Sequence, residues 1–292
     1  MTNKKRQYDS SSSEIFSKVA VIIPALNEEK TIGESITSLK NQILSPHRII
    51  VVNDGSTDKT DDIAKSFQEV EIVTRKPHES YVGKKELAIT LNAGLEELCY
   101  DKKCNYILIL GSDIILPKNY LFEMTKRMDE NPNVVIASGI VQGEYSNIPR
   151  GAGRVIRYEF WKKLGLKYPI NHGFEAYLVF KAQSLGYDVK NFSDLIITTQ
   201  RKTGQKYASN LYYYYGLGIK ALGYSMPYAL GRIIIFAKKN PKGALKMLQG
   251  FLSNYDQLYE PELRQYVKQT QRNNIFHINR NLKNIYNLLK NL

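Results

Sequence analysis

The stretch RIIVVNDGSTDKT, residues 48–60, decides the fold of this 292-residue chain. Its run RIIVVN has the length and the β-branched content of a strand that is buried on both faces. Asp54 follows the strand and Gly55 makes a tight turn, after which Ser56 or Thr57 can cap a helix. A buried strand that turns directly into a helix is the repeating unit of a parallel sheet.

The same unit recurs on both sides of this stretch. VAVIIP precedes it and YILIL follows it, and each is a continuous apolar run that leads into a polar loop. Such strands alternating with helices predict an α/β fold, a mostly parallel central sheet flanked by helices. The expected strands are 19–24, 48–53, 71–75, 106–110 and 134–139, and the expected helices are about 31–41, 57–67, 84–98 and 118–131.

Beyond residue 150 the alternation weakens into helical stretches. The segment KNFSDLIITTQRKTG is the exception, because it predicts a strand that runs into a basic loop. The expected helices of this part are about 154–164, 175–185, 211–222, 241–252 and 261–272.

Composition narrows the class of protein. With 43% hydrophobic and 24% charged residues the chain is globular, not disordered. Residues 1–150 carry 19 Lys and Arg and 21 Asp and Glu, whereas residues 151–292 carry 22 and 7. The basic second half indicates a partner of opposite charge, and nucleic acid, an anionic membrane surface and a phosphorylated substrate all qualify.

The cysteines and the start of the chain bear on the compartment. Cys99 and Cys104 are too few for a disulfide framework and indicate thiols of a reducing compartment. MTNKKRQYDSSSSE has no apolar core of a signal peptide, and no apolar run reaches the roughly 18 residues of a membrane span. We therefore expect a cytoplasmic protein, soluble or peripheral on the cytoplasmic face of the membrane.

The loops at the carboxyl ends of the strands are the candidate sites, since ligands of such sheets bind there. PALNEE, residues 24–29, offers polar side chains to a ligand, although the same residues can cap a helix. Asp54 can bind a donor N–H or a ribose hydroxyl, or serve an N-cap and Asx-turn. Gly83-Lys84-Lys85 suits a phosphate at a helix start or is a solvated lysine pair, and it lacks the frame of a P-loop.

Four stretches taken together are more specific than any one of them. VAVIIPALNEEKTIGESITSL, IIVVNDGSTDKT, GKKELAITLNAGLE and YILILGSDIILPKNYL, in this order, resemble the family-2 glycosyltransferases. The resemblance covers roughly residues 19–200. It implies the A-type glycosyltransferase fold and an inverting enzyme that uses a nucleotide-activated sugar.

The resemblance implies roles in donor binding for residues of the first loops. Pro24, Leu26 and Glu28 match the first loop that contacts the nucleotide, and Asp54 matches the acid that reads the base or the ribose. Lys84 lies where the family has a basic residue near the diphosphate.

The sequence Gly111-Ser112-Asp113 stands at the family's Asp-x-Asp site, where a divalent metal bridges a protein carboxylate and the donor diphosphate. The resemblance implies Asp113 as the metal ligand and Ser112 as a contact of the nucleotide sugar. Hard oxygen ligands suit Mg²⁺ or Mn²⁺, with phosphates and waters completing the shell. Gly111 replaces the first acid of this motif, and Asn53 replaces the first acid of the second loop.

Inverting transfer needs a carboxylate that deprotonates the acceptor hydroxyl. In the family this base precedes a basic residue by about six positions, which implies Glu175 as the base and Lys181 as its basic partner. Phe174 replaces the acid that relatives have before the base. Arg201, in the basic stretch QRK, resembles the residue that neutralises the leaving diphosphate.

The resemblance also divides the chain. Residues 1–17 form a lead-in that we expect to be disordered, and residues 18–205 form the catalytic domain. Within it, 18–115 is the nucleotide-sugar part and 116–205 the acceptor part. Residues 206–292 are a basic, Tyr-rich helical extension.

Tyrosine is concentrated at the start of the extension, since residues 207–228 hold seven of the 21 tyrosines of the chain. Apolar helix faces with tyrosines and cationic flanks suit an anionic membrane interface. The alternative is an ordinary helical cap over the sheet.

Together these features predict a metal-dependent inverting glycosyltransferase. It would move a sugar from a nucleoside-diphosphate sugar donor to a glycan or lipid-linked acceptor in cell-surface glycan synthesis. Three acids of the family are replaced, at Asn53, Gly111 and Phe174. A protein that binds a sugar nucleotide without catalysing transfer is therefore an alternative. A nucleic-acid-binding protein is the alternative from another class, although no nucleic-acid motif appears and we expect no such partner. A nucleotidyltransferase would need a Gly-rich opening loop that is missing here.

Overall fold

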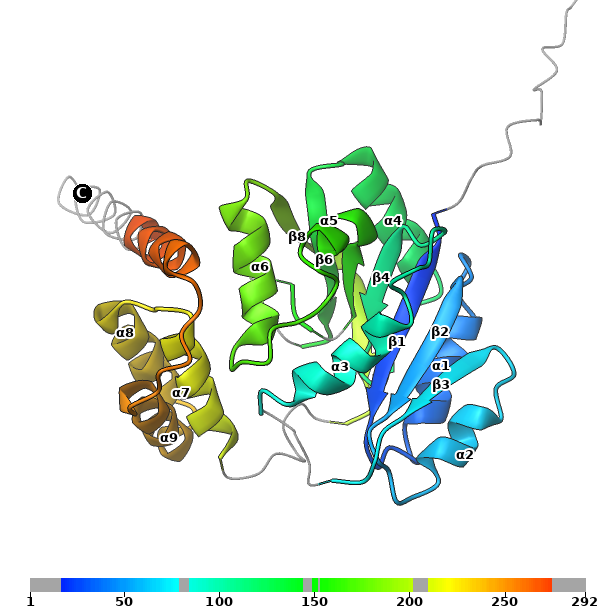
Figure 1. Cartoon of the computed structure of the whole chain (residues 1–292), viewed down its shortest axis with the longest axis horizontal. Helices are drawn as coiled ribbons and strands as arrows, with labels where there is room; N and C mark the ends of the chain where they lie inside the picture. The colour runs from blue at the N-terminus through cyan, green and yellow to red at the C-terminus, as the bar shows by residue number, and fades with distance from the viewer. Residues whose placement is uncertain (1–16, 79–83, 144–148, 152, 202–209, 275–292) are drawn as a thin grey trace, which may run out of the picture.

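The computed structural model describes residues 17–78, 84–143, 149–151, 153–201 and 210–274. Most of the expected lead-in, Gly83 and Lys202 lie outside these residues. Figure 1 shows a sheet with helices packed around it and a group of helices from the end of the chain beside it.

The central sheet confirms the expected α/β fold. Its strands run in the order β3-β2-β1-β4-β7-β6-β8-β5. Neighbours from β3 to β4 are parallel, as are β6 and β8, whereas β7 is antiparallel to both β4 and β6, and β5 is antiparallel to β8. The strands are β1 (Val19–Ala25), β2 (Arg48–Asn53), β3 (Val70–Thr74), β4 (Tyr106–Ile109), β5 (Ile114–Ile115), β6 (Val134–Val141), β7 (Arg154–Arg157) and β8 (Asp188–Thr199).

The register of the parallel strands brings their carboxyl ends to one edge of the sheet. Ala25 of β1 is paired with Asn53 of β2, and Asn53 in turn with Thr74 of β3. Ile109 of β4 is paired with Ile22 of β1. The loops that follow these strands therefore open at the same edge.

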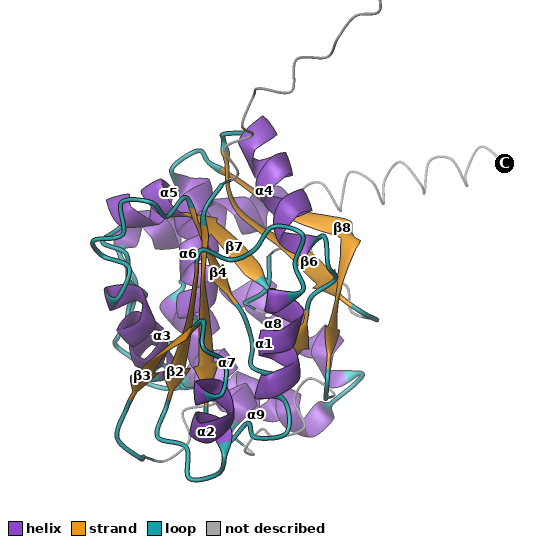
Figure 2. Cartoon of the chain, turned by 90° about the vertical axis from the view of Figure 1, so that its right-hand side faces the viewer, coloured by secondary structure: helices purple, strands orange, loops and turns teal. Residues whose placement is uncertain are grey.

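Side chains of β1 alternate between the two faces of the sheet, as a strand buried on both faces requires. Val21 and Ile23 pack with α1, α2 and α4, whereas Ala20 and Ile22 pack with α3, α5 and α6. Figure 2 shows helices on both faces of the sheet. The helices of this part are α1 (Ile32–Lys40), α2 (Thr60–Lys65), α3 (Leu87–Glu96), α4 (Tyr120–Glu130), α5 (Tyr158–Lys163) and α6 (Phe174–Ser184).

Three further helices follow β8 and form a separate apolar cluster. They are α7 (Leu211–Ala221), α8 (Met226–Ala237) and α9 (Pro241–Leu252), with Ala229, Met247 and Phe251 among the buried residues between them. Residues 261–274 form one more helix. No helix among the described residues is long and apolar enough to cross a membrane.

Three local expectations were wrong. The stretch 154–164, expected as one helix, begins with strand β7 and only then forms α5, because Arg154–Arg157 completes the sheet between β4 and β6. Helix α2 starts at Thr60, so Ser56 and Thr57 lie outside it. Helix α8 was not expected, since Pro227 and Gly231 are poor residues for a helix interior. Pro227 stands in its first turn, where proline is tolerated.

Candidate active site at the carboxyl edge of the sheet

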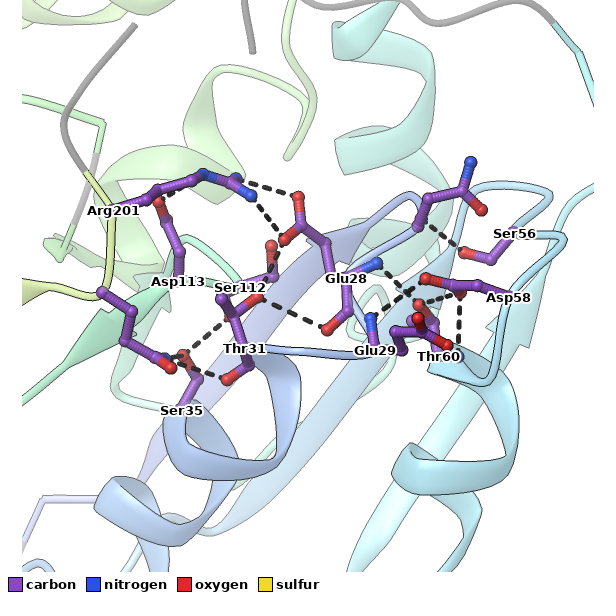
Figure 3. Close-up of polar contacts among 12 residues, drawn as sticks. Glu28, Glu29, Thr31, Ser35, Ser56, Asp58, Thr60, Ser112, Asp113 and Arg201 are labelled. Atoms are coloured by element: carbon purple, nitrogen blue, oxygen red, sulfur yellow. Dashed lines mark hydrogen bonds and ion pairs between the residues drawn. The ribbon is translucent and has the colours of Figure 1, made fainter. Parts of the chain in front are cut away.

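The loop after β1 is held against the loop after β2 by hydrogen bonds in both directions. Asn27, in a left-handed conformation with φ of 54°, donates its N–H to Ser56 Oγ at 3.0 Å, and its Oδ1 accepts from Thr57 N at 2.8 Å. Glu28 N donates to Thr60 Oγ1 at 2.7 Å (Figure 3). The polar residues that could have been helix caps thus fix the two loops to each other. Pro24 and Leu26 are half-buried in the first loop.

Asp54 is buried at the end of β2 between two basic groups. Its Oδ1 lies 3.1 Å from Arg75 Nη1 and 3.0 Å from His78 Nε2. The turn behind it requires glycine, because a Cβ on Gly55 would stand 2.5 Å from Pro77 Cα and φ is 78°. The acid expected to read the nucleotide therefore belongs to a polar cluster that also includes residues after β3. Arg75 and His78 were missed, although RKPH, residues 75–78, starts at the last residue of the third predicted strand and leads into the same edge.

The Gly-Ser-Asp turn after β4 is anchored on helix α1. Ser35, fully buried on that helix, donates bifurcated hydrogen bonds to the carbonyls of Ser112 at 2.9 Å and Ile114 at 2.7 Å. The carbonyl of Asp113 accepts from Gln200 N at 2.9 Å, which ties the turn to the end of β8. This turn presents the Asp113 carboxylate to the edge where the first loop also lies.

Arg201 joins the two acids expected to serve donor and metal binding. Its Nη1 and Nη2 bind the Glu28 carboxylate at 2.6 and 2.8 Å, and its Nε lies 2.9 Å from Asp113 Oδ2 (Figure 3). Burial raises the pKa of the Asp113 carboxyl and the nearby Glu28 charge adds to this, while the Arg201 guanidinium opposes both. The three residues were predicted from three separate loops, and the structure brings them into one cluster.

The cluster of Glu28, Asp113 and Arg201 is the place to ask whether the site can hold a divalent metal. Nowhere in the described part of the chain do three or more His, Cys, Asp or Glu side chains gather as a metal site would need. Gly111 leaves little room for the lost acid, since a Cβ there would stand 3.1 Å from Asp113 Oδ1. Glu28 and Asp113 nevertheless converge on one cationic group, so this position favours positive charge. Their oxygens suit a hard cation if Arg201 moves aside.

The predicted phosphate lysine lies next to the start of α3. Lys84 precedes the helix, which begins at Leu87, three residues later than expected, with Glu86 as N-cap. The neighbouring Lys85 donates from Nζ to Gln257 Oε1 at 2.7 Å, so this loop contacts the segment that follows α9.

The predicted base, Glu175, lies in the first turn of α6 after Gly173, whose φ is 77°. Its main-chain carbonyl accepts from Arg154 Nη1 at 3.1 Å, and Arg154 Nη2 donates to Pro149 O at 2.6 Å. The Glu175 carboxylate lies against the backbone of Gly151, where a Cβ would collide with Oε1 and stand 2.9 Å from Cδ. Buried Arg154 thus holds the main chain at Glu175, and Gly151 leaves the room that the carboxylate occupies. Sequence patterns indicated neither residue.

Lys181, at the basic position six residues after Glu175, contacts the segment that follows α9. Lys181 Nζ lies 2.6 Å from Glu260 Oε1, and Tyr177 Oη donates to the same carboxylate at 3.3 Å. Tyr177 also stacks on Tyr259 with ring centroids 4.6 Å apart. Lys181 therefore holds the segment around Glu260 against α6.

His172, just before α6, completes this contact. Its ring stacks on Tyr214 of α7 at 5.4 Å, and its carbonyl accepts from Tyr259 Oη at 3.2 Å. Burial lowers the pKa of His172 to about 4. The helices that follow β8 are thus packed on the residues that lead into Glu175.

Comparisons with known proteins show the family and the fold of the chain. The sequence model of Glycosyl transferase family 2 matches residues 20–184. An uncharacterized glycosyltransferase of Haemophilus influenzae is 31% identical over 120 residues, 40% of this chain and 34% of that protein. Poly-beta-1,6-N-acetyl-D-glucosamine synthase of Staphylococcus epidermidis is 25% identical over 121 residues, 41% of this chain and 28% of that protein. The matched region spans about a third of these relatives.

A solved structure has a similar fold. It is the mannosyltransferase PcManGT from Pyrobaculum calidifontis in complex with GDP-Man and Mn²⁺, with a TM-score of 0.57 and 18% identity. The likeness covers 86% of this chain and 74% of that one. At this level of identity it concerns the fold, and the fold is the A-type glycosyltransferase fold expected from the sequence.

Proposed function

The chain belongs to glycosyl transferase family 2, and we propose that it moves a sugar from a nucleoside-diphosphate sugar, with inversion, to a glycan or lipid-linked acceptor. The observation that carries the proposal is the convergence of Glu28, Asp113 and Arg201. Two acids and one cation from three loops meet at the carboxyl edge, where ligands of parallel sheets bind. Such a cluster can exchange partners with a ligand that carries a diphosphate.

The nucleotide would lie across the loops after β1, β2 and β3. Pro24 and Leu26 supply half-buried surface to it, and Ser112 supports the sugar end from the turn after β4. Asp54 would accept from the base or the ribose. The neighbouring Arg75 and His78 hold its carboxylate in place through contacts of 3.1 and 3.0 Å.

Arg201 would change partners when the donor arrives. Its guanidinium now binds two carboxylates, and a diphosphate offers the same paired oxygens with more charge. Moving to the phosphates frees Asp113 to hold Mg²⁺ or Mn²⁺. Bound there, the metal would neutralise charge on the diphosphate. Lys84, before α3, would add a second cation on that side.

Glu175 would act as the base in a single displacement. Its carboxylate takes the proton of the acceptor hydroxyl, and that oxygen forms a bond to the anomeric carbon. The bond from this carbon to the diphosphate breaks on the opposite face, and the diphosphate leaves with the electron pair. Lys84 and Arg201 balance the charge that develops on the leaving group.

The acceptor is proposed from the basic second half and the relatives. One relative is named as a synthase of a polysaccharide, poly-beta-1,6-N-acetyl-D-glucosamine. We propose a cell-surface glycan or its lipid-linked precursor as acceptor, and a place on the cytoplasmic face of the membrane. Residues 116–205, which include α6, would form the acceptor part.

Replacing the base separates catalysis from binding. Glu175→Gln should lower the rate of donor turnover by about 100-fold or more while donor affinity stays within about threefold. Sugar transfer or donor hydrolysis, measured beside calorimetric titration of the same donor, gives both quantities. Unchanged turnover in this variant would remove Glu175 from the mechanism.

One observation favours a second candidate. Gly111 and the pairing of Arg201 with Asp113 both suit a protein that binds a sugar nucleotide without transferring the sugar. That protein would bind the donor but show no turnover with any acceptor or with water, and Glu175→Gln would then change neither quantity.

A further inference from the structure

Helix α8 turns an apolar side to solvent. Ala229 and Ile233 are its buried residues and pack with α9, whereas Ile234 is 63% and Ile235 70% exposed. Met226 and Leu230 are exposed as well. These four exposed residues, Met226, Leu230, Ile234 and Ile235, are called here the α8 outer face. A soluble surface helix would carry polar residues on such a face.

The segment that carries this face is cationic. Residues 201–252 contain nine Lys and Arg and no Asp or Glu. Five of these cations are exposed on or next to α8 and α9, and Leu245 and Leu252 are exposed apolar residues on α9. The five are Arg232, Lys238, Lys239, Lys242 and Lys246.

Exposed aliphatic side chains and exposed cations together identify the partner. Anionic lipid headgroups attract the lysines, and the interface just below them accepts apolar side chains of a helix lying flat. Helices α8 and α9 have 12 residues each, which suits lying in the interface and not crossing it. We propose that the α8 outer face docks on an anionic membrane surface.

The fold links this surface to the proposed base. Helix α7, which packs on α9, places Gly218 with its Cα 3.2 Å from where a Cβ on Gly173 would stand. Gly173 starts α6, and Glu175 lies in the first turn of that helix. Docking would therefore hold the base near a lipid-linked acceptor. This consequence rests on the proposed function, whereas the docking itself does not.

Other occupants fit the face less well. A second copy of the chain would bury the aliphatic residues but bring an equally cationic surface against this one. A nucleic acid would match the cations but not the isoleucines, which are not stacking residues. Only the membrane interface uses both features.

Flotation with lipid vesicles tests the proposal on the full chain. We expect it to float with phosphatidylcholine vesicles that contain phosphatidylglycerol, less so at high salt, and poorly with phosphatidylcholine alone. Ile234→Asp with Ile235→Asp should lower the bound fraction about tenfold or more, and Lys238→Glu with Lys239→Glu should lower it on anionic vesicles. The matched control is Ile43→Asp with Leu185→Asp, at residues 68% and 52% exposed elsewhere, which should float as the unaltered chain does.

Each other outcome overturns the proposal. It is wrong if the chain does not float, if it floats equally with both vesicle types, or if the α8 variants float as well as the control. A dimer in sedimentation velocity that the Asp substitutions dissociate, without vesicle binding, would assign the face to a second copy. Donor titration of the same variants should be unchanged, so a failure of docking and a failure of donor binding remain distinguishable.

Discussion

At the scale of single residues, Arg201 is the cation that pairs with both carboxylates of the candidate site. It binds Glu28 through two nitrogens and Asp113 through a third. Glu28 is buried, and Asp113 has a raised pKa because of its own burial. Without the guanidinium, two partly desolvated carboxylates would face each other, which is unfavourable unless another cation takes its place.

Arg201→Ala should therefore bind a divalent cation better than the unaltered chain when no donor is present. We expect Mn²⁺ alone to raise the melting temperature of this variant, and to raise that of the unaltered chain much less, because the cation fills the position of the lost guanidinium. Differential scanning fluorimetry with and without Mn²⁺ measures this. Arg201→Lys is the control and should lie between the two, while equal shifts in all three would mean that Arg201 does not compete with metal.

Gly151 is a second residue whose substitution is informative. A Cβ at this position would collide with the Glu175 carboxylate, and the end of a flexible side chain can move. Gly151→Ala should thus lower kcat by about 10- to 100-fold through misplacement of the base, with little change in melting temperature. Gly33→Ala on α1, where a Cβ meets Ile63 at an ordinary 3.5 Å, should leave kcat unchanged. Full activity in Gly151→Ala would show that the carboxylate acts from elsewhere.

At the scale of elements, sequence patterns predicted strands that are buried on both faces better than elements that depend on their neighbours. The apolar runs at 19–24 and 48–53 became β1 and β2, because the strand period and the turn residues are local. β7 was mistaken for helix because its place between β4 and β6 is set by long-range pairing. Helix α8 was missed because packing on α9 outweighs the low propensity of Gly231.

The contact between α7 and α9 depends on two glycines, Gly216 and Gly250. A Cβ on Gly216 would stand 2.7 Å from Phe251 N and would collide with the carbonyl of Met247, and neither backbone can move locally. Gly216→Ala should destabilise the chain by about 2–4 kcal/mol through this overlap. Gly231→Ala on α8, where a Cβ meets nothing within 4 Å, should be neutral or stabilising by less than about 1 kcal/mol. Urea unfolding of both variants measures the difference, and equal stability would mean that the helices are not so closely packed.

At the scale of the whole molecule, the helices after β8 are joined to the sheet domain through the residues around α6. The stacking of His172 on Tyr214 and the ion pair of Lys181 with Glu260 lie on this junction. The resemblance to the family implied Glu28, Asp113 and Arg201 as site residues, because its motifs at strand ends are short and local in sequence. It missed Arg75, His78 and Arg154, because their roles arise from contacts with residues far along the chain.

Buried His172 makes stability depend on pH. Its folded pKa of about 4 lies below the ordinary value of 6.5, so the unfolded chain binds the extra proton first as pH falls. Stability from this residue is full above pH 6.5 and is lost as pH falls toward 4, by about 1–2 kcal/mol at pH 5. Urea unfolding at pH 7.5 and pH 5 should show this loss of unfolding free energy. His172→Phe keeps a ring against Tyr214 but cannot be protonated, so its loss between the two pH values should be smaller by about this amount. An identical pH dependence in both proteins would mean that His172 is not buried in the neutral form.

The most direct measurement is isothermal titration of the chain with UDP-, GDP- and dTDP-sugars, with and without Mn²⁺, repeated on Asp113→Ala. We expect that at least one donor binds, that Mn²⁺ strengthens the binding, and that the metal effect disappears in Asp113→Ala. Failure of every donor to bind would contradict the proposed function, and a metal effect that survives in Asp113→Ala would contradict the role given to that carboxylate.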